Sequence, residues 1–120
     1  MFFVEKPLAT NLVECDAMIA ASRTAGCFLM IGHILRFETK YAMLKDEIAS
    51  NRLGKAVSMH ARRNRPKSLL VLYGRTHPAL EIFIHDVDLM LCYVNAPVRQ
   101  VRGYARHATG RKHPETFWGG

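Results

Sequence analysis

The N-terminal part of the chain places two short apolar runs on either side of a segment with helical spacing. Residues 2–4, Phe-Phe-Val, and residues 27–31, Cys-Phe-Leu-Met-Ile, are continuously apolar, which is typical of buried strands in a parallel sheet. Between them, apolar side chains recur at helical spacing up to Ala25, with Thr10 as the expected N-cap and Gly26 at the expected C-terminal end. Strand, helix and strand in this order predict a βαβ unit with a right-handed crossover.

The rest of the chain predicts a second group of elements. An amphipathic helix is expected at residues 38–50, a strand at 56–63, an almost wholly apolar helix at 79–94 and a strand with one charged face at 98–107. Residues 64–78 contain two prolines, one glycine and four basic side chains, which indicates a surface loop. The pattern therefore favours a mixed α/β (α+β) fold.

The overall charge is basic. The chain has 120 residues, with 17 Lys and Arg against 10 Asp and Glu, for a formal net charge of +7. Such a balance is typical of proteins that bind nucleic acids, anionic membranes or anionic small molecules, and also of a solvated basic surface. The basic run from Arg62 to Arg65 has only Tyr73 as a nearby aromatic residue and matches no nucleic-acid module, which disfavours a nucleic-acid partner.

Cysteine usage and hydropathy predict a compartment. Cys15, Cys27 and Cys92 are widely spaced, which favours a reducing environment over a disulfide scaffold. Glu5 and Lys6 interrupt the first apolar run, which excludes a secretory signal there, and no apolar stretch approaches the roughly 20 residues that span a bilayer. We therefore expect a soluble cytoplasmic protein with no membrane partner.

Polar side chains on the predicted helix at 79–94 are candidates for chemistry. Glu81, His85, Asp88 and Cys92 lie at i, i+4, i+7 and i+11, which is one stripe of a helix. A carboxylate one turn before an imidazole can fix its tautomer, and a histidine that titrates near neutrality can accept a hydroxyl proton. Three alternatives stay open: a histidine satisfied in a core, an acidic cluster suited to the helix dipole, and a metal site, which the lack of a second histidine at helical spacing disfavours.

Two loops that follow the predicted strands carry further candidates. Lys6 stands at the carboxyl end of the first strand, where ligands bind in open α/β sheets, and Pro7 can hold a fixed turn, in trans or cis form, that aims the lysine. The alternative is a loop lysine that points into water. Gly32 permits a sharp turn after the second strand, and Arg36 can clamp an anion or a sugar hydroxyl or form an ion pair in a linker.

Four motifs that occur in a fixed order indicate a protein family more specifically than any one of them does alone. Together they resemble the Gfo/Idh/MocA family, the glucose–fructose oxidoreductase and inositol dehydrogenase group, from Phe2 to about Trp118. The motifs are EKPLATN at 5–11, IGHILRF at 31–37, NRLGK at 51–55 before a segment with RRN at 62–64, and HDVDLMLCYVNAPVRQVRGYA at 85–105. The resemblance implies an NAD(P)-dependent dehydrogenase that oxidises a hydroxyl of a sugar, cyclitol or related polyol by hydride transfer.

The resemblance also implies residue roles in catalysis. The lysine of the family's EKP motif corresponds to Lys6, which would contact the substrate hydroxyl and tune the base. The family's catalytic histidine corresponds to His85, the expected proton acceptor. Glu81 stands where many members carry a substrate-binding aspartate, and Arg36 matches a position near the substrate cleft.

The EKP motif further implies cofactor contacts. Glu5, Lys6 and Pro7 would line the pocket for NAD or NADP near the nicotinamide, and no metal is implied. A dinucleotide site also needs a glycine-rich turn before a helix N-terminus, and no G-x-G-x-x-G occurs in the sequence. In the family that motif lies well upstream of EKP.

The resemblance therefore implies a domain organisation. Residues 1–32 would be the last βαβ unit of a Rossmann nucleotide-binding domain, and residues 33–120 the first part of a substrate-binding and oligomerisation domain with an open, mostly antiparallel sheet. We expect an internal fragment of a homo-oligomeric enzyme with a small polyol substrate, inactive alone. The alternative is a non-enzymatic binding or scaffold module with the same fold, and unpaired sheet edges favour self-association in either case.

The missing phosphate cradle generates a prediction about the cofactor. The isolated 120-residue chain should show no saturable NADH binding in a fluorescence titration, because no segment of it can hold the pyrophosphate. Binding with a dissociation constant on the order of 1 μM, a free energy of about −8 kcal/mol, would contradict this expectation.

Overall fold

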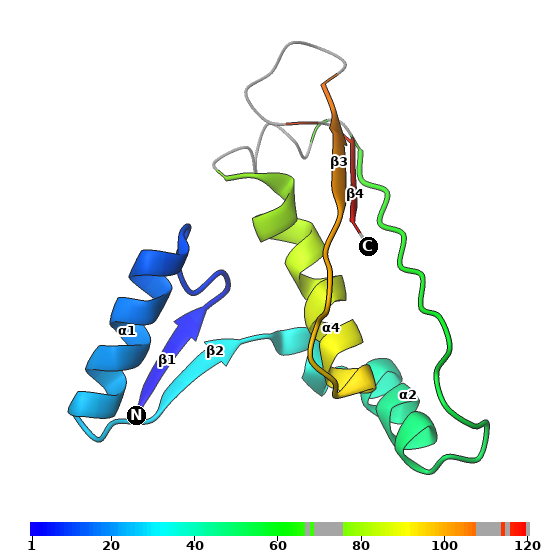
Figure 1. Ribbon diagram of the computed structural model, residues 1–120, viewed down its shortest axis with the longest axis horizontal. Coiled ribbons are helices and arrows are strands. Elements are labelled where there is room, and N and C mark those ends of the chain that lie inside the picture. The colour runs from blue at the N-terminus through cyan, green and yellow to red at the C-terminus, as the bar shows by residue number, and fades with distance from the viewer. Residues whose placement is uncertain (67, 69–75, 108–113, 115, 120) are drawn as a thin grey trace. The chain divides into compact units, whose positions relative to one another are not determined.

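The structure is a computed structural model that describes residues 1–66, 68, 76–107, 114 and 116–119 (Figure 1). The chain forms two compact units, residues 1–34 and residues 35–120. The assignment of residues 1–32 and 33–120 to a nucleotide-binding and a substrate domain stays a prediction.

The first unit is a βαβ unit. Strand β1 (Phe2–Glu5) pairs in parallel with strand β2 (Leu29–Gly32), and helix α1 (Leu12–Thr24) connects them. Phe2 lies opposite Leu29 and Glu5 opposite Gly32 in the register. The predicted strand–helix–strand order and parallel pairing are confirmed.

The ends of α1 depend on two residues. Asn11 is the N-cap, and its side-chain Oδ1 accepts a hydrogen bond of 2.9 Å from the backbone N–H of Glu14. The prediction of Thr10 as the cap is wrong by one residue, because asparagine is the stronger capping residue and stands next to Thr10. Gly26 follows the end of the helix with φ of 59°, a left-handed conformation that glycine adopts most easily, as predicted.

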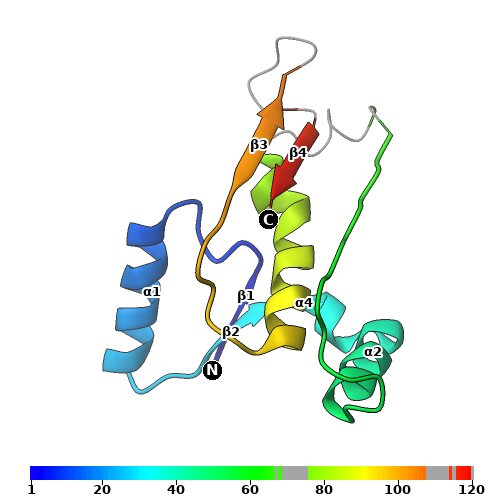
Figure 2. The same ribbon diagram turned by 45° about the vertical axis from the view of Figure 1, so that its right-hand side comes forward.

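The second unit contains the remaining helices and a hairpin (Figure 2). Its helices are α2 (Thr39–Ala49) and α4 (Ile84–Val94). The π-helical turn η2 (Ala79–Phe83) directly precedes α4. The 3₁₀ turn η1 (Ile34–Phe37) begins at the last residue of the first unit and continues into the second. Strands β3 (Gly103–Arg106) and β4 (Thr116–Gly119) pair antiparallel, with Gly103 opposite Gly119. The mixed α/β class is confirmed.

Three predicted elements differ from the structure. Residues 56–63 form no strand ladder among the described residues, although Figure 2 shows them in an extended path. The expected strand at 98–107 is shortened to β3, and the expected helix at 79–94 begins with η2 instead of a regular α-helical turn. Most of the expected loop at 64–78 lies outside the described residues.

Helices α2 and α4 pack on each other around a small core. Leu89 is the only buried hydrophobic residue that the described part of the chain contains, with 5% of its surface exposed. The Tyr93 hydroxyl on α4 donates a hydrogen bond of 3.2 Å to the backbone carbonyl of Tyr41 on α2. Since burial of apolar area is the main favourable contribution to folding, so small a core gives polar contacts of this unit more weight.

The cap of α1 gives a stability prediction. Replacing Asn11 with Ala should lower the free energy of unfolding of the first unit by about 1 kcal/mol, because the Glu14 N–H loses its acceptor. Amide hydrogen exchange at Glu14 should become faster, and a thermal melt should shift downward. The matched variant Thr10→Ala should leave both unchanged, and the reverse ranking would contradict the assignment of the cap.

Candidate functional site

The carboxyl end of β1 places Lys6 where the sequence predicts it. Glu5 is the last residue of β1, and the Lys6–Pro7 peptide bond that follows is cis. Lys6 and Pro7 are both half-buried. Lys6 therefore directly follows the carboxyl end of a strand of the parallel pair.

Gly32 shapes the same edge from the neighbouring strand. A Cβ atom at Gly32 would lie 3.1 Å from Cζ of Phe3 and 3.2 Å from Oε2 of Glu5. Such distances are tighter than ordinary van der Waals contacts, so a side chain at this position would displace the Glu5 carboxylate. The glycine thus permits the carboxylate to lie over the end of β2.

Helix α4 carries His85 directly before two buried acids, Asp86 and Asp88. Asp86 and Asp88 are each 8% exposed and are the only buried charged residues in the described part of the chain. His85 is half-buried and its Nδ1 atom is shielded from solvent. The catalytic candidate thus sits in the most polar stretch of an otherwise apolar helix.

Asp88 forms a two-point ion pair with Arg36. The Arg36 Nε donates to Oδ2 at 2.7 Å and Nη2 donates to Oδ1 at 2.6 Å. The hydrogen bond to Asp88 raises the pKa of Arg36 further above its usual value, so the guanidinium stays charged. The structure thus shows Arg36 in an ion pair, which was one of the two roles expected for it. The other role, contact with substrate, stays a prediction.

Asp86 forms a second ion pair, with Arg63 of the extended segment. The Arg63 Nε lies 2.7 Å from Oδ2 and 3.0 Å from Oδ1 of Asp86. The hydrogen bond to Asp86 likewise raises the pKa of Arg63. Sequence reasoning placed Arg63 only in a basic run and gave Asp86 no role. The one available signal was the presence of acids on a buried helix, which require a cation somewhere in the fold.

Glu81 lies in η2, one turn before His85 in sequence. Its Oε1 accepts hydrogen bonds from the backbone N–H of Thr76 at 3.1 Å and from the Thr76 hydroxyl at 2.8 Å. Glu81 is half-buried. These bonds hold the carboxylate at the start of the helical segment that carries the histidine.

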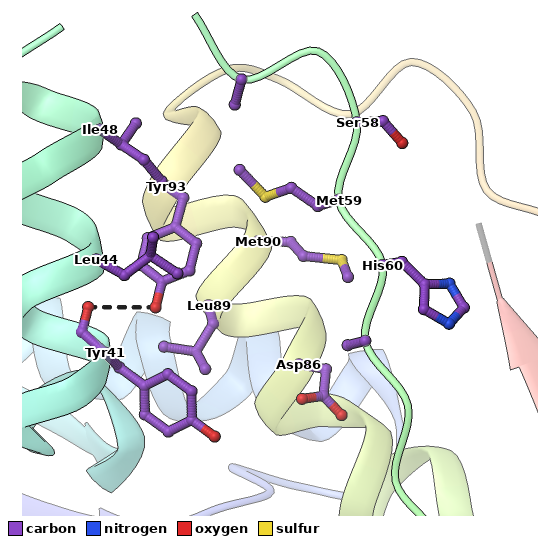
Figure 3. Close-up of a pocket in the computed structure, with 12 residues that line it drawn as sticks. Tyr41, Leu44, Ile48, Ser58, Met59, His60, Asp86, Leu89, Met90 and Tyr93 are labelled. Atoms are coloured by element: carbon purple, nitrogen blue, oxygen red, sulfur yellow. Dashed lines mark hydrogen bonds between the residues drawn. The ribbon is translucent and has the colours of Figure 1, made fainter. Parts of the chain in front are cut away.

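A groove that the sequence did not predict lies between α2, α4 and the extended segment (Figure 3). Its volume is about 380 Å³. Met59 of the segment and Met90 of α4 face each other across it in Figure 3. The lining is mostly apolar, with Ser58, His60 and Asp86 as its polar members. In the sequence, its signals were the apolar stripe predicted for residues 38–50 and the alternation at 56–63.

The described residues contain neither a group of metal-ligand side chains nor a membrane-spanning helix. No group of three or more His, Cys, Asp or Glu side chains there is arranged to hold a metal ion. No helix in the described part of the chain combines the length and apolar character needed to cross a membrane.

Comparison with solved structures defines the class of fold. The chain matches a probable dehydrogenase from Thermotoga maritima with a TM-score of 0.74 at 24% identity, over 96% of this chain and 37% of that one. It matches an NAD-binding protein from Listeria innocua with a TM-score of 0.73 at 17% identity, over 98% of this chain and 36% of that one. The chain therefore shares its fold with a part of each of these two proteins.

Two curated relatives are named inositol 2-dehydrogenase. The inositol 2-dehydrogenase of Acidothermus cellulolyticus is 30% identical over 115 residues, which cover 94% of this chain and 33% of the relative. The inositol 2-dehydrogenase of Salmonella typhimurium is 30% identical over 103 residues, which cover 85% of this chain and 30% of the relative. No protein-family model matches the chain. The resemblance to the Gfo/Idh/MocA dehydrogenases is confirmed, and the chain spans about a third of the length of the relatives it matches.

Tyr93 gives a pH-dependent stability prediction. Burial raises the pKa of its phenol above the ordinary value of 10.0, so the folded state holds this proton more tightly than the unfolded state. The contribution of the protonated Tyr93 side chain to the free energy of unfolding is fully present below pH 10.0, and it is lost as the pH rises through the raised pKa. Tyr93→Phe should lower the free energy of unfolding by about 1 kcal/mol at neutral pH through the lost hydrogen bond to Tyr41, and the deficit should shrink in alkali.

Urea unfolding followed by circular dichroism at pH about 7 and about 11 measures this difference. The matched variant is Tyr104→Phe, which should leave the free energy of unfolding at neutral pH unchanged because Tyr104 is 67% exposed. An equal deficit for Tyr93→Phe at both pH values would contradict the role of burial.

Proposed function

We propose that this chain supplies the substrate-side residues of an NAD(P)-dependent oxidoreductase that oxidises a hydroxyl of a sugar, cyclitol or related polyol. The observation that carries the proposal is the match of 94% of the chain to a relative named inositol 2-dehydrogenase. The proposal assigns residues 1–32 to the end of a nucleotide-binding domain and residues 33–120 to part of a substrate domain.

The proposed chemistry divides between two residues. His85 accepts the proton of the substrate hydroxyl, and the Lys6 ammonium polarises the same oxygen and stabilises the negative charge that develops on it. The nicotinamide, when bound, supplies the acceptor for the hydride. Lys6 is supported by its place at the carboxyl end of β1, and His85 by its half-buried place on α4 beside two paired acids.

Substrate binding is proposed for Glu81 and Arg36. The Glu81 carboxylate is held by Thr76, and a carboxylate is an acceptor group that suits a polyol hydroxyl. A guanidinium has five N–H donors, and the Arg36 side chain is 45% exposed, so donors remain beyond those given to Asp88. Both side chains suit a neutral polyhydroxylated ligand.

Cofactor binding is proposed for Glu5, Lys6 and Pro7, whose turn lies at the edge of the sheet where dinucleotides bind in this class of fold. These residues fit the nicotinamide end of NAD or NADP, whereas the chain offers no glycine-rich cradle for the pyrophosphate. We therefore propose that the chain alone has no dehydrogenase activity.

Self-association and a cytoplasmic location complete the proposal. Large apolar side chains are strongly exposed in both units, including Phe2, Phe3, Val57, Val101 and Trp118. Exposed apolar surface of this kind is typical of protein interfaces and supports a homo-oligomer. Cys15, Cys27 and Cys92 are all free thiols, which supports a reducing compartment.

A chimera tests the proposed activity. This chain replaces the matched third of the Acidothermus inositol 2-dehydrogenase, and NADH formation from myo-inositol is followed by absorbance. The chimera should be active, and His85→Asn should reduce kcat by roughly 10²–10⁴-fold because general base catalysis is lost. Lys6→Met should reduce kcat as well.

The matched control is His107→Asn, which removes an exposed imidazole and should leave kcat unchanged. A folded chimera that binds NADH but forms no product would contradict the enzyme and favour the non-enzymatic binding module. Equal activity of the His85→Asn and His107→Asn variants would contradict the role of His85.

A further inference from the structure

The two ion pairs of α4 hold this helix from different directions. An α-helix advances by about 100° per residue, so Asp86 and Asp88 point roughly 200° apart around the helix axis. Arg63 in the extended segment binds the first acid, and Arg36 in η1 binds the second. The helix is therefore held on two sides by cations from two separate segments.

His85 projects between the two attachments. On the same helical geometry, Asp86 lies about 100° to one side of His85 and Asp88 about 60° to the other. A rotation of α4 that turns His85 away must stretch bonds whose donor–acceptor distances are 2.6–2.7 Å at their shortest. The pairs therefore constrain the direction of the imidazole.

Apolar packing alone constrains α4 weakly. Leu89 is its only buried apolar side chain, and the groove beside Met90 leaves part of one face open. Buried ion pairs add little net stability compared with apolar residues of the same size, but they can specify one arrangement of a structure. These observations favour a role in orientation over a role in stability.

We propose that Arg36 and Arg63 are positioning residues, which set the rotation of α4 about its axis through Asp88 and Asp86 and so direct His85 toward the substrate. The link to substrate rests on the proposed function. The effect on the helix does not rest on it, because it concerns only contacts within residues 35–120.

Nuclear magnetic resonance of the 120-residue chain tests the proposal. Residual dipolar couplings of backbone N–H groups in a helix vary with a period of 3.6 residues, and the phase of this variation reports the rotation of the helix about its axis. The phase for α4 is measured relative to α2, together with the imidazole Cε1–Hε1 signal of His85. Neither readout requires cofactor or turnover.

The variants replace each pair by apolar side chains so that no buried charge is left alone. They are Arg63→Met with Asp86→Leu, and Arg36→Met with Asp88→Leu. The α4 phase should move by on the order of 20° or more, and the His85 signal should shift. Two further variants, Arg63→Lys and Arg36→Lys, keep the charge of each pair. They should show smaller but still measurable changes, because the charge remains while lysine lacks the planar fork of arginine.

Two exposed arginines give the matched controls. Arg62 is exposed and bonds to Asn64, and Arg52 forms an exposed ion pair with Glu47. Arg62→Met and Arg52→Met should change neither the phase nor the His85 signal. An unchanged α4 phase in a folded pair replacement overturns the proposal; if the pair replacements do not fold, an unchanged phase in both lysine variants overturns it.

The test separates this inference from the proposed activity. A moved helix in a chain whose chimera is inactive supports the positioning role and counts against the dehydrogenase. An active chimera whose α4 phase does not respond to loss of the pairs supports the dehydrogenase and counts against the positioning role.

Discussion

Placing two carboxylates on a buried helix is the constraint on which the second unit depends. An uncompensated charge in such a place costs several kcal/mol, so Asp86 and Asp88 each require a cation at short distance. Arg63 and Arg36 satisfy this requirement, and in doing so they tie the extended segment and η1 to α4. Two segments that lie far apart in the sequence are thereby held to one helix.

The first unit was predictable because its signals are local. Two apolar runs and a helical spacing lie within a few dozen residues, and parallel pairing follows from the crossover between them. The capping residue was missed by one position, since Thr10 and Asn11 both suit an N-cap and the stronger capping residue, asparagine, takes that place.

The second unit was less predictable because its contacts are distant in sequence. Residues 56–63 alternate like a strand, but a strand exists only beside a partner, and the sequence does not state where the partner lies. The ion pairs join residues 52 and 23 positions apart, which no periodicity reveals. Motif order did identify Lys6 and His85 as candidates, whereas the residues that hold α4 became visible only in the structure.

The ion pairs of the second unit also differ in how strongly they respond to ionic strength. Mobile ions screen interactions between solvated charges strongly and those between buried charges much less. The exposed pairs Lys40–Glu38 and Arg52–Glu47 are open to such screening, whereas the Arg63–Asp86 pair, with side chains 26% and 10% exposed, is largely sheltered. The attachment of α4 through Arg63 is thus less sensitive to salt than the surface pairs, whereas its attachment through Arg36, whose side chain is 45% exposed, is more open to screening.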